Sequence, residues 1–64
     1  MTLKDFLKVA DTDECVFTIQ DNNPRNLKVL QSEMPVKFIN SDYLNNRIVS
    51  IMARDWEFII TIEI

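Results

Sequence analysis

The chain has no histidine, and this absence excludes several chemistries at once. Histidine is the side chain whose unperturbed pKa lies nearest to neutral pH, so a Ser-His-Asp or Cys-His catalytic relay cannot form here. Zinc sites also lose one of their usual ligands. A hydrolase or a zinc enzyme of these kinds is therefore not expected.

Glycine is also absent, and cysteine occurs once. Phosphate-binding loops of the GxGxxG or GxxxxGK[ST] type need residues without side chains where the backbone approaches the phosphate, so these nucleotide-binding motifs are excluded. Cys15 can form neither an intramolecular disulfide nor a CxxC pair. We expect it to be a small buried hydrophobe, and a single cysteine favours a reducing, cytoplasmic compartment.

The charge balance and the apolar runs exclude two further classes of partner. Ten acidic residues outnumber seven Lys and Arg residues, which gives a net charge of -3 at pH 7. The bases are scattered, whereas phosphate contacts need clustered Lys and Arg, so a nucleic-acid partner is not expected. Because the apolar runs span only a few residues, we expect neither a membrane-spanning helix nor a secretory signal.

The amino-terminal half predicts a helix followed by a hairpin. Apolar residues recur at helical spacing over residues 2–10, and Thr2 and Asp5 fit a capping box at the start of this helix. A strand, a turn rich in Asn and Asp, and a second strand follow over residues 15–20, 21–24 and 26–31.

Residues 34–46 leave two interpretations open. Val36, Ile39 and Tyr43 stand at helical spacing after a proline, but the β-branched and aromatic residues of this segment also suit a strand. We favour a short helix over residues 35–40, followed by a polar turn.

A hairpin is predicted at the carboxy end, where strands over residues 48–53 and 56–64 flank the polar pair Arg54-Asp55. Alternate residues of the last strand are apolar and are expected to face the core: Trp56, Phe58, Ile60, Ile62 and Ile64. Which face of the preceding strand is buried stays open; the outer face would receive either Ile48 with Met52 or Val49 with Ile51.

These elements predict a single small α+β domain over residues 1–64, in the order α-β-β-α-β-β. An antiparallel four-stranded sheet made of two hairpins would carry the N-terminal helix and the short second helix on one face, in two layers.

Two groups of carboxylates could form chemical sites, but neither pattern is specific. The acidic run at residues 11–14 lacks the spacing and the glycine of an EF-hand loop, so a solvated end of the helix is expected rather than a metal site. Asp55, Glu57 and Glu63 could form an acid pair for hydrolysis, but a chain of this size cannot both enclose a substrate pocket and keep a core. We therefore expect no enzymatic activity, no metal and no cofactor.

The outer face of the predicted sheet is not uniformly polar, and this feature points toward a function. The alternation of the strands leaves a modest apolar strip there: Val16, Thr18, Met52, Ile59 and Thr61. Single exposed hydrophobes are normal, but a strip with a charged rim is also typical of a self-association or partner site. A closing strand without proline would, at the edge of the sheet, be open to pairing with another strand.

Three segments of the chain carry a resemblance to a known group. They are the run Ser-Asp-Tyr-Leu-Asn-Asn-Arg-Ile-Val-Ser-Ile at residues 41–51, the opening Thr-Leu-Lys-Asp-Phe-Leu at residues 2–7, and the strand that ends in Asp21. Taken together with these segments, the chain over nearly its full length resembles short uncharacterised proteins of Gram-positive bacteria, prophages and mobile elements. The chain departs from that group at residues 22–24, where Asn-Asn-Pro stands in place of a glycine-containing turn. The resemblance implies a phage or mobile-element context and carries over no residue role.

Together these observations predict a non-enzymatic interaction module of the phage accessory type, which binds a protein partner stoichiometrically or associates with itself as a homodimer. Inhibition of a host or defence protein falls within this prediction. The alternative is an oligomeric protein that sequesters a small ligand in a pocket between subunits, since one subunit is too small to enclose a ligand.

Overall fold

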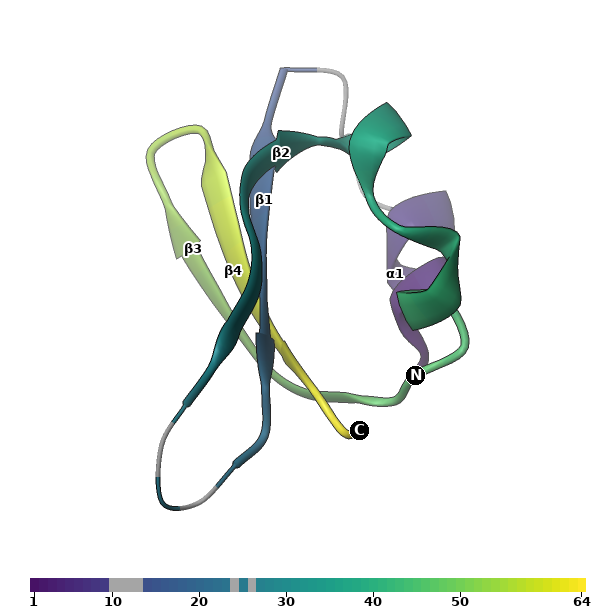
Figure 1. The fold of residues 1–64 in the computed structure, drawn as a ribbon. Coiled ribbons are helices and arrows are strands. Elements are labelled where there is room, and N and C mark those ends of the chain that lie inside the picture. Colours follow the sequence, from purple (N-terminus) through teal and green to yellow (C-terminus); the bar gives the residue numbers. More distant parts are fainter. Residues whose placement is uncertain (10–13, 24, 26) are drawn as a thin grey trace.

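The computed structural model describes residues 1–9, 14–23, 25 and 27–64. Within this part of the chain it contains one α-helix, two short 3-10 helices and a four-stranded sheet (Figure 1). The α+β class predicted from the sequence is confirmed. No helix in the described residues has the length and apolar character needed to span a membrane.

Helix α1 (Leu3–Val9) begins with the predicted capping box. The Asp5 backbone N–H donates to Thr2 Oγ1 and the Thr2 N–H donates to the Asp5 carboxylate, each over 3.2 Å. Two further N–H groups of the first turn donate to carbonyl oxygens of the loop before the third strand, from Leu3 at 3.0 Å and from Lys4 at 2.9 Å. The start of the helix therefore has partners for its exposed donors. Its predicted end, at residue 10, lies outside the described residues.

The sheet has the order β2-β1-β4-β3. Its strands are β1 (Val16–Asp21), β2 (Val29–Pro35), β3 (Ile48–Arg54) and β4 (Glu57–Ile62). Both predicted hairpins are confirmed, since β1 pairs with β2 and β3 with β4 in antiparallel fashion. The two hairpins join through β1 and β4, which run parallel, so the sheet is mixed and the prediction of an antiparallel sheet is wrong.

The parallel pairing has a clear physical reason. It places Phe17 beside Phe58 and Ile19 beside Ile60, so the most apolar positions of the two hairpins meet in the middle of the sheet. The alternation of side chains along a strand shows which face is buried but carries no information on the direction of a distant partner strand.

The predicted helix over residues 35–40 is wrong. Pro35 closes strand β2, and two 3-10 helices follow, η1 (Val36–Phe38) and η2 (Ser41–Tyr43). Between them Ile39 and Asn40 are extended, with ψ of 130° and 125°, which ends any continuous helix. The Asn40 side chain then accepts a hydrogen bond from the Asp42 N–H at 2.9 Å and caps η2. The predicted spacing of apolar residues still holds, because Val36, Ile39 and Tyr43 all pack against the core.

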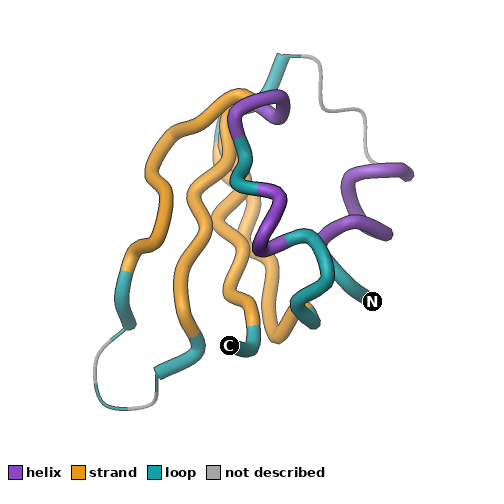
Figure 2. The backbone as a smooth tube through the Cα atoms, turned by 45° about the vertical axis from the view of Figure 1, so that its right-hand side comes forward, coloured by secondary structure: helices purple, strands orange, loops and turns teal. Residues whose placement is uncertain are grey.

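The core lies between the sheet and the segments on one side of it. Five of the described side chains are completely buried: Leu3, Phe17, Ile19, Ile60 and Ile62. The Phe58 ring stacks on Phe17 at 5.6 Å between centroids and meets the edge of Phe6 at 5.5 Å. Figures 1 and 2 show α1, η1 and η2 on the same side of the sheet. We call the sheet face that bears Phe17 and Ile60 the core face, and its opposite the outer face.

Several boundaries and faces differ from the prediction. Strand β2 begins and ends later than expected, and Cys15 is half-buried rather than fully buried. Trp56 and Ile64, both expected in the core, are each 68% exposed. Ile64 lies beyond the end of β4, and Trp56 belongs to the two-residue turn between β3 and β4, with a left-handed φ of 64°.

On strand β3, one residue from each of the two predicted alternatives faces the core. Ile48 is opposite Ile62 and Ile51 is opposite Ile60, so both lie on the core face. A register shift at Val49 makes this possible, because the extra residue interrupts the strict alternation. Met52, opposite Ile59, lies on the outer face.

Candidate interaction surface

The strand register places the five predicted strip residues on the outer face. Neighbours across a ladder share a face, so Thr18, Ile59 and Met52 form one row across β1, β4 and β3. The row on one side of it holds Gln20, Thr61 and Ser50. The row on the other side holds Val16, Glu57 and Arg54.

The two threonines of this face are buried, and both form hydrogen bonds with neighbouring residues. The Thr18 hydroxyl donates to the Glu57 carboxylate at 2.8 Å and accepts the Glu33 backbone N–H at 3.2 Å. The Gln20 amide donates to the Thr61 hydroxyl at 2.9 Å. Thr18 and Thr61 are only 9% and 6% exposed. These two residues therefore hold the surrounding side chains in place and offer little surface for contact with a partner.

Strand β3 and the turn after it carry exposed apolar side chains at this edge of the sheet, with Met52 on the outer face and Ile51 on the core face. Met52 is 56% exposed, while Ile59 and Val16 are half-buried. Val49, Ile51 and Trp56 add exposed fractions of 50%, 42% and 68%. We name Val49, Ile51, Met52 and Trp56 the β3 edge cluster.

The sequence prediction included Met52 but missed the other three members of this cluster as a group. The faces of Val49 and Ile51 depend on the register shift, which the sequence does not reveal. The alternating pattern predicts Trp56 in the core, and this prediction is wrong. The lack of glycine means that some other residue must supply the positive φ of a two-residue turn, but Asp55 adopts that conformation more readily than Trp56. No signal in the sequence therefore places Trp56 in the turn.

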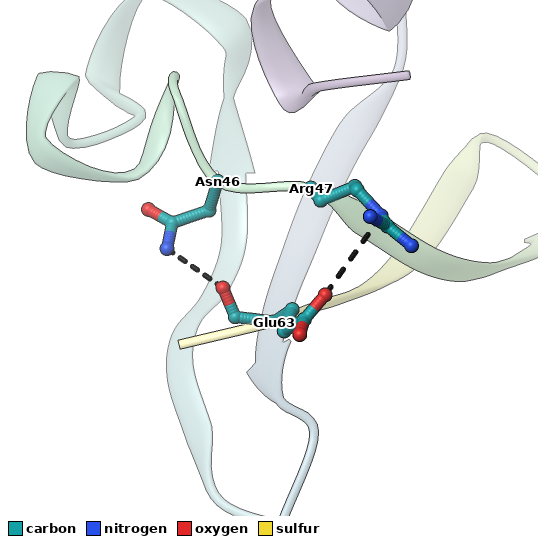
Figure 3. Close-up of polar contacts among 3 residues, drawn as sticks. All are labelled: Asn46, Arg47 and Glu63. Carbon is teal, nitrogen blue, oxygen red and sulfur yellow. Dashed lines mark hydrogen bonds and ion pairs between the residues drawn. The ribbon is translucent and has the colours of Figure 1, made fainter.

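Polar contacts fix the chain at the start of β3 (Figure 3). The Asn46 side-chain amide donates to the Glu63 carbonyl oxygen at 2.8 Å, and the Arg47 guanidinium lies 3.8 Å from the Glu63 carboxylate. This ion pair is largely exposed, so its contribution is small. On the other side, the Ile48 N–H donates to the Met1 carbonyl oxygen at 2.9 Å, and Thr2 forms a bridge with Arg47. The N-terminus thus covers the beginning of the β3 edge.

The acids considered in the sequence do not gather into a chemical site within the part of the chain that the structure describes. Glu57 is held by Thr18 and Glu63 lies beside Arg47. No three Asp, Glu, Cys or His side chains in the described ranges are placed to share a metal ion. Most of the acidic run at residues 11–14 lies outside these ranges.

Comparisons with models of protein families, with curated proteins and with solved structures find no significant match for this chain. The arrangement of the outer face and the β3 edge cluster is therefore the basis for a functional interpretation.

Proposed function

We propose that this protein is a non-enzymatic interaction module that binds a protein partner stoichiometrically through its outer face. We infer a two-layer arrangement, in which the helix and the 3-10 helices occupy the core face and leave the outer face available for contact. The bacterial cytoplasm, in a phage or mobile-element context, is the setting that this proposal assigns to the protein.

One observation carries the proposal: Ile59, which is half-buried, and Met52, which is 56% exposed, form an apolar row with hydrogen-bonded side chains beside it on the same face. On either side of this row, Glu57 and Gln20 engage the two threonines and keep the surface in a fixed shape. A fixed apolar centre with a polar rim is the usual composition of a protein interface. The Glu57 carboxylate accepts the hydrogen bond from Thr18, which supports partner contact rather than hydrolysis as the function of this surface.

The experiment replaces Ile59 by Lys and compares the proteins that the tagged chain retains from a Gram-positive bacterial lysate. Ile59 is half-buried in the central row, so a lysine there keeps its stem against the sheet and projects a charge into the contact. The matched control is Leu27→Lys, at a position 56% exposed outside the sheet.

We expect Ile59→Lys to lose the proteins that the wild type and Leu27→Lys both retain, while the circular dichroism of all three stays the same. Retention of the same proteins by Ile59→Lys would contradict the proposal. A wild type that retains nothing above a tag-only control would do so as well.

A further inference from the structure

The two edge strands of the sheet, β2 and β3, differ in how well they are protected from pairing with a further strand. Strand β2 contains Glu33 with a φ of 52°, two register irregularities and a proline at its end. Such features prevent a further strand from pairing with it. Strand β3 has no proline and has a single charged residue, Arg54, at its last position. It has one register shift, at Val49, and no residue with positive φ, so from Ser50 onward the described part of its edge has none of these protections.

Hydrogen bonds to β1 show which way the backbone of β4 points. The Trp56 carbonyl oxygen accepts from the Val16 N–H at 2.8 Å, and that of Ile62 accepts from the Asn22 N–H at 2.9 Å. The even-numbered residues of β4 therefore direct their backbone groups toward β1, and the odd-numbered ones toward β3. The 2.8 Å bond from the Glu63 N–H to the Arg47 carbonyl oxygen agrees with this parity.

The same parity identifies the open groups of β3. Met52 and Arg54 are opposite Ile59 and Glu57, so their backbone groups are used by β4. Ile51 and Ala53 lie between these positions and direct their N–H and C=O groups away from the sheet. A new strand would find these groups unoccupied by β4, with exposed apolar side chains of the β3 edge cluster on both sides of them.

We propose that a second copy of this chain pairs with β3 in antiparallel fashion, with the two Met52 residues opposite each other across a two-fold axis. This inference rests on the proposed function and adds to it the identity of one partner. Two copies that pair in this way satisfy both open edges at once, in a closed symmetric interface. The pairing extends the outer-face row so that Ile59 and Met52 of one copy continue into Met52 and Ile59 of the other.

The register follows from three constraints. Ile51 and Ala53 must face outward groups of the copy, which allows only registers in which odd-numbered residues meet odd-numbered residues. Residues 47 and 48 are already covered by Met1 and Thr2, so strand β3 of the copy, which ends at Arg54, must not reach them. Pairing about Met52 gives the longest overlap that meets both conditions. It also sets each Arg54 opposite Ser50, so the two like charges are kept apart.

The test measures the oligomeric state by sedimentation equilibrium over a range of protein concentrations. The wild type is expected to form dimers. Met52→Lys and Met52→Glu are each expected to weaken dimer formation by about tenfold or more, because like charges would meet at the axis. A one-to-one mixture of these two variants is expected to restore a dimer, since opposite charges then face each other.

The matched control compares the two edges. In this register Val49 is opposite Asp55 of the copy, so Val49→Glu on β3 should weaken the dimer by like-charge repulsion. Val29→Glu on β2, at an almost equal exposure of 52% against 50%, should not. The single tryptophan gives an independent signal, since Trp56 emission should shift to shorter wavelength as dimers form.

A wild type that stays monomeric at every concentration would overturn this inference, and so would a Val29 variant as defective as the Val49 variant. Failure of the mixed Met52 variants to pair would overturn the register. Because Ile59 contributes no group to the strand edge, the capture experiment with Ile59→Lys fails or succeeds independently of these results.

Discussion

Glu33 offers a test of the backbone geometry that protects the β2 edge. Its φ of 52° lies in the left-handed region, which disfavours any residue with a Cβ atom. Its side chain is exposed, and its role in the sheet comes from the backbone N–H, which donates to Thr18 Oγ1 at 3.2 Å. Replacement of Glu33 by Gly or by Ala removes the same carboxylate and keeps this N–H. The difference between the two variants therefore isolates the effect of the Cβ atom.

The expected magnitude follows from two opposing effects. A residue with a Cβ atom in the left-handed conformation costs about 1–2 kcal/mol. Glycine loses more backbone freedom on folding, which costs about 0.5–1 kcal/mol relative to alanine. Glu33→Gly should therefore be more stable than Glu33→Ala by roughly 0.5–1 kcal/mol. For a domain of this size, that difference corresponds to a midpoint of thermal unfolding about 3–7 °C higher.

The assay is thermal unfolding of both variants, with the neighbouring Ser32 as control. Ser32 is also exposed in β2, but its φ is not positive, so Ser32→Gly should be less stable than Ser32→Ala by about 0.5–1 kcal/mol. The sign of the Gly-to-Ala difference should thus reverse between adjacent residues. If Gly is the less stable choice at both positions, Glu33 does not adopt the left-handed conformation and the argument for a protected β2 edge fails.

Three further predictions test other parts of the fold. The Thr2 N–H holds the pKa of Asp5 below its ordinary value of 3.8, so Asp5→Asn should lower stability at neutral pH. In thermal melts this difference should disappear as the pH falls through the lowered pKa. A difference that persists in acid contradicts this prediction. Gln31→Ala removes hydrogen bonds of 3.1 and 2.8 Å to backbone groups of the segment after β2, and urea unfolding should show a loss of about 1 kcal/mol, whereas an unchanged midpoint would mean that these bonds add nothing. Phe6→Leu removes the edge contact with Phe58 and should cost about 0.5–1.5 kcal/mol in the same assay, and a neutral result would place α1 away from that ring.

Local features of the fold could be predicted from the sequence, because their causes are local. The Thr2 and Asp5 capping box depends on residues three positions apart, and the structure contains both of its hydrogen bonds. The two hairpins depend on strands separated by short turns, and the structure pairs both as expected. Burial of Phe17 in β1, and of Ile60 and Ile62 in β4, follows from the alternation within each strand.

The remaining features depend on distant partners or on single residues that break a pattern. Nothing in the alternation of β1 or β4 specifies that they run parallel. The shift at Val49 adds one residue to β3 and changes which side chains reach the outer face, and no local signal marks it. The candidate surface was therefore only partly predictable. The alternation predicts Met52 and Ile59 on it, but wrongly predicts Trp56 in the core.

The absence of glycine connects these surface features. Among the described residues, Glu33 and Trp56 are the ones with left-handed φ values, and they serve the two opposite edges of the sheet. At Glu33 the conformation interrupts the ladder of edge strand β2, so a further strand cannot follow it. At Trp56 the conformation closes the β3–β4 turn without disturbing β3, and leaves the indole exposed beside its edge. A positive φ at a residue other than glycine thus blocks the β2 edge and adds an aromatic side chain to the β3 edge. For this reason we assign partner binding to the β3 side of the molecule.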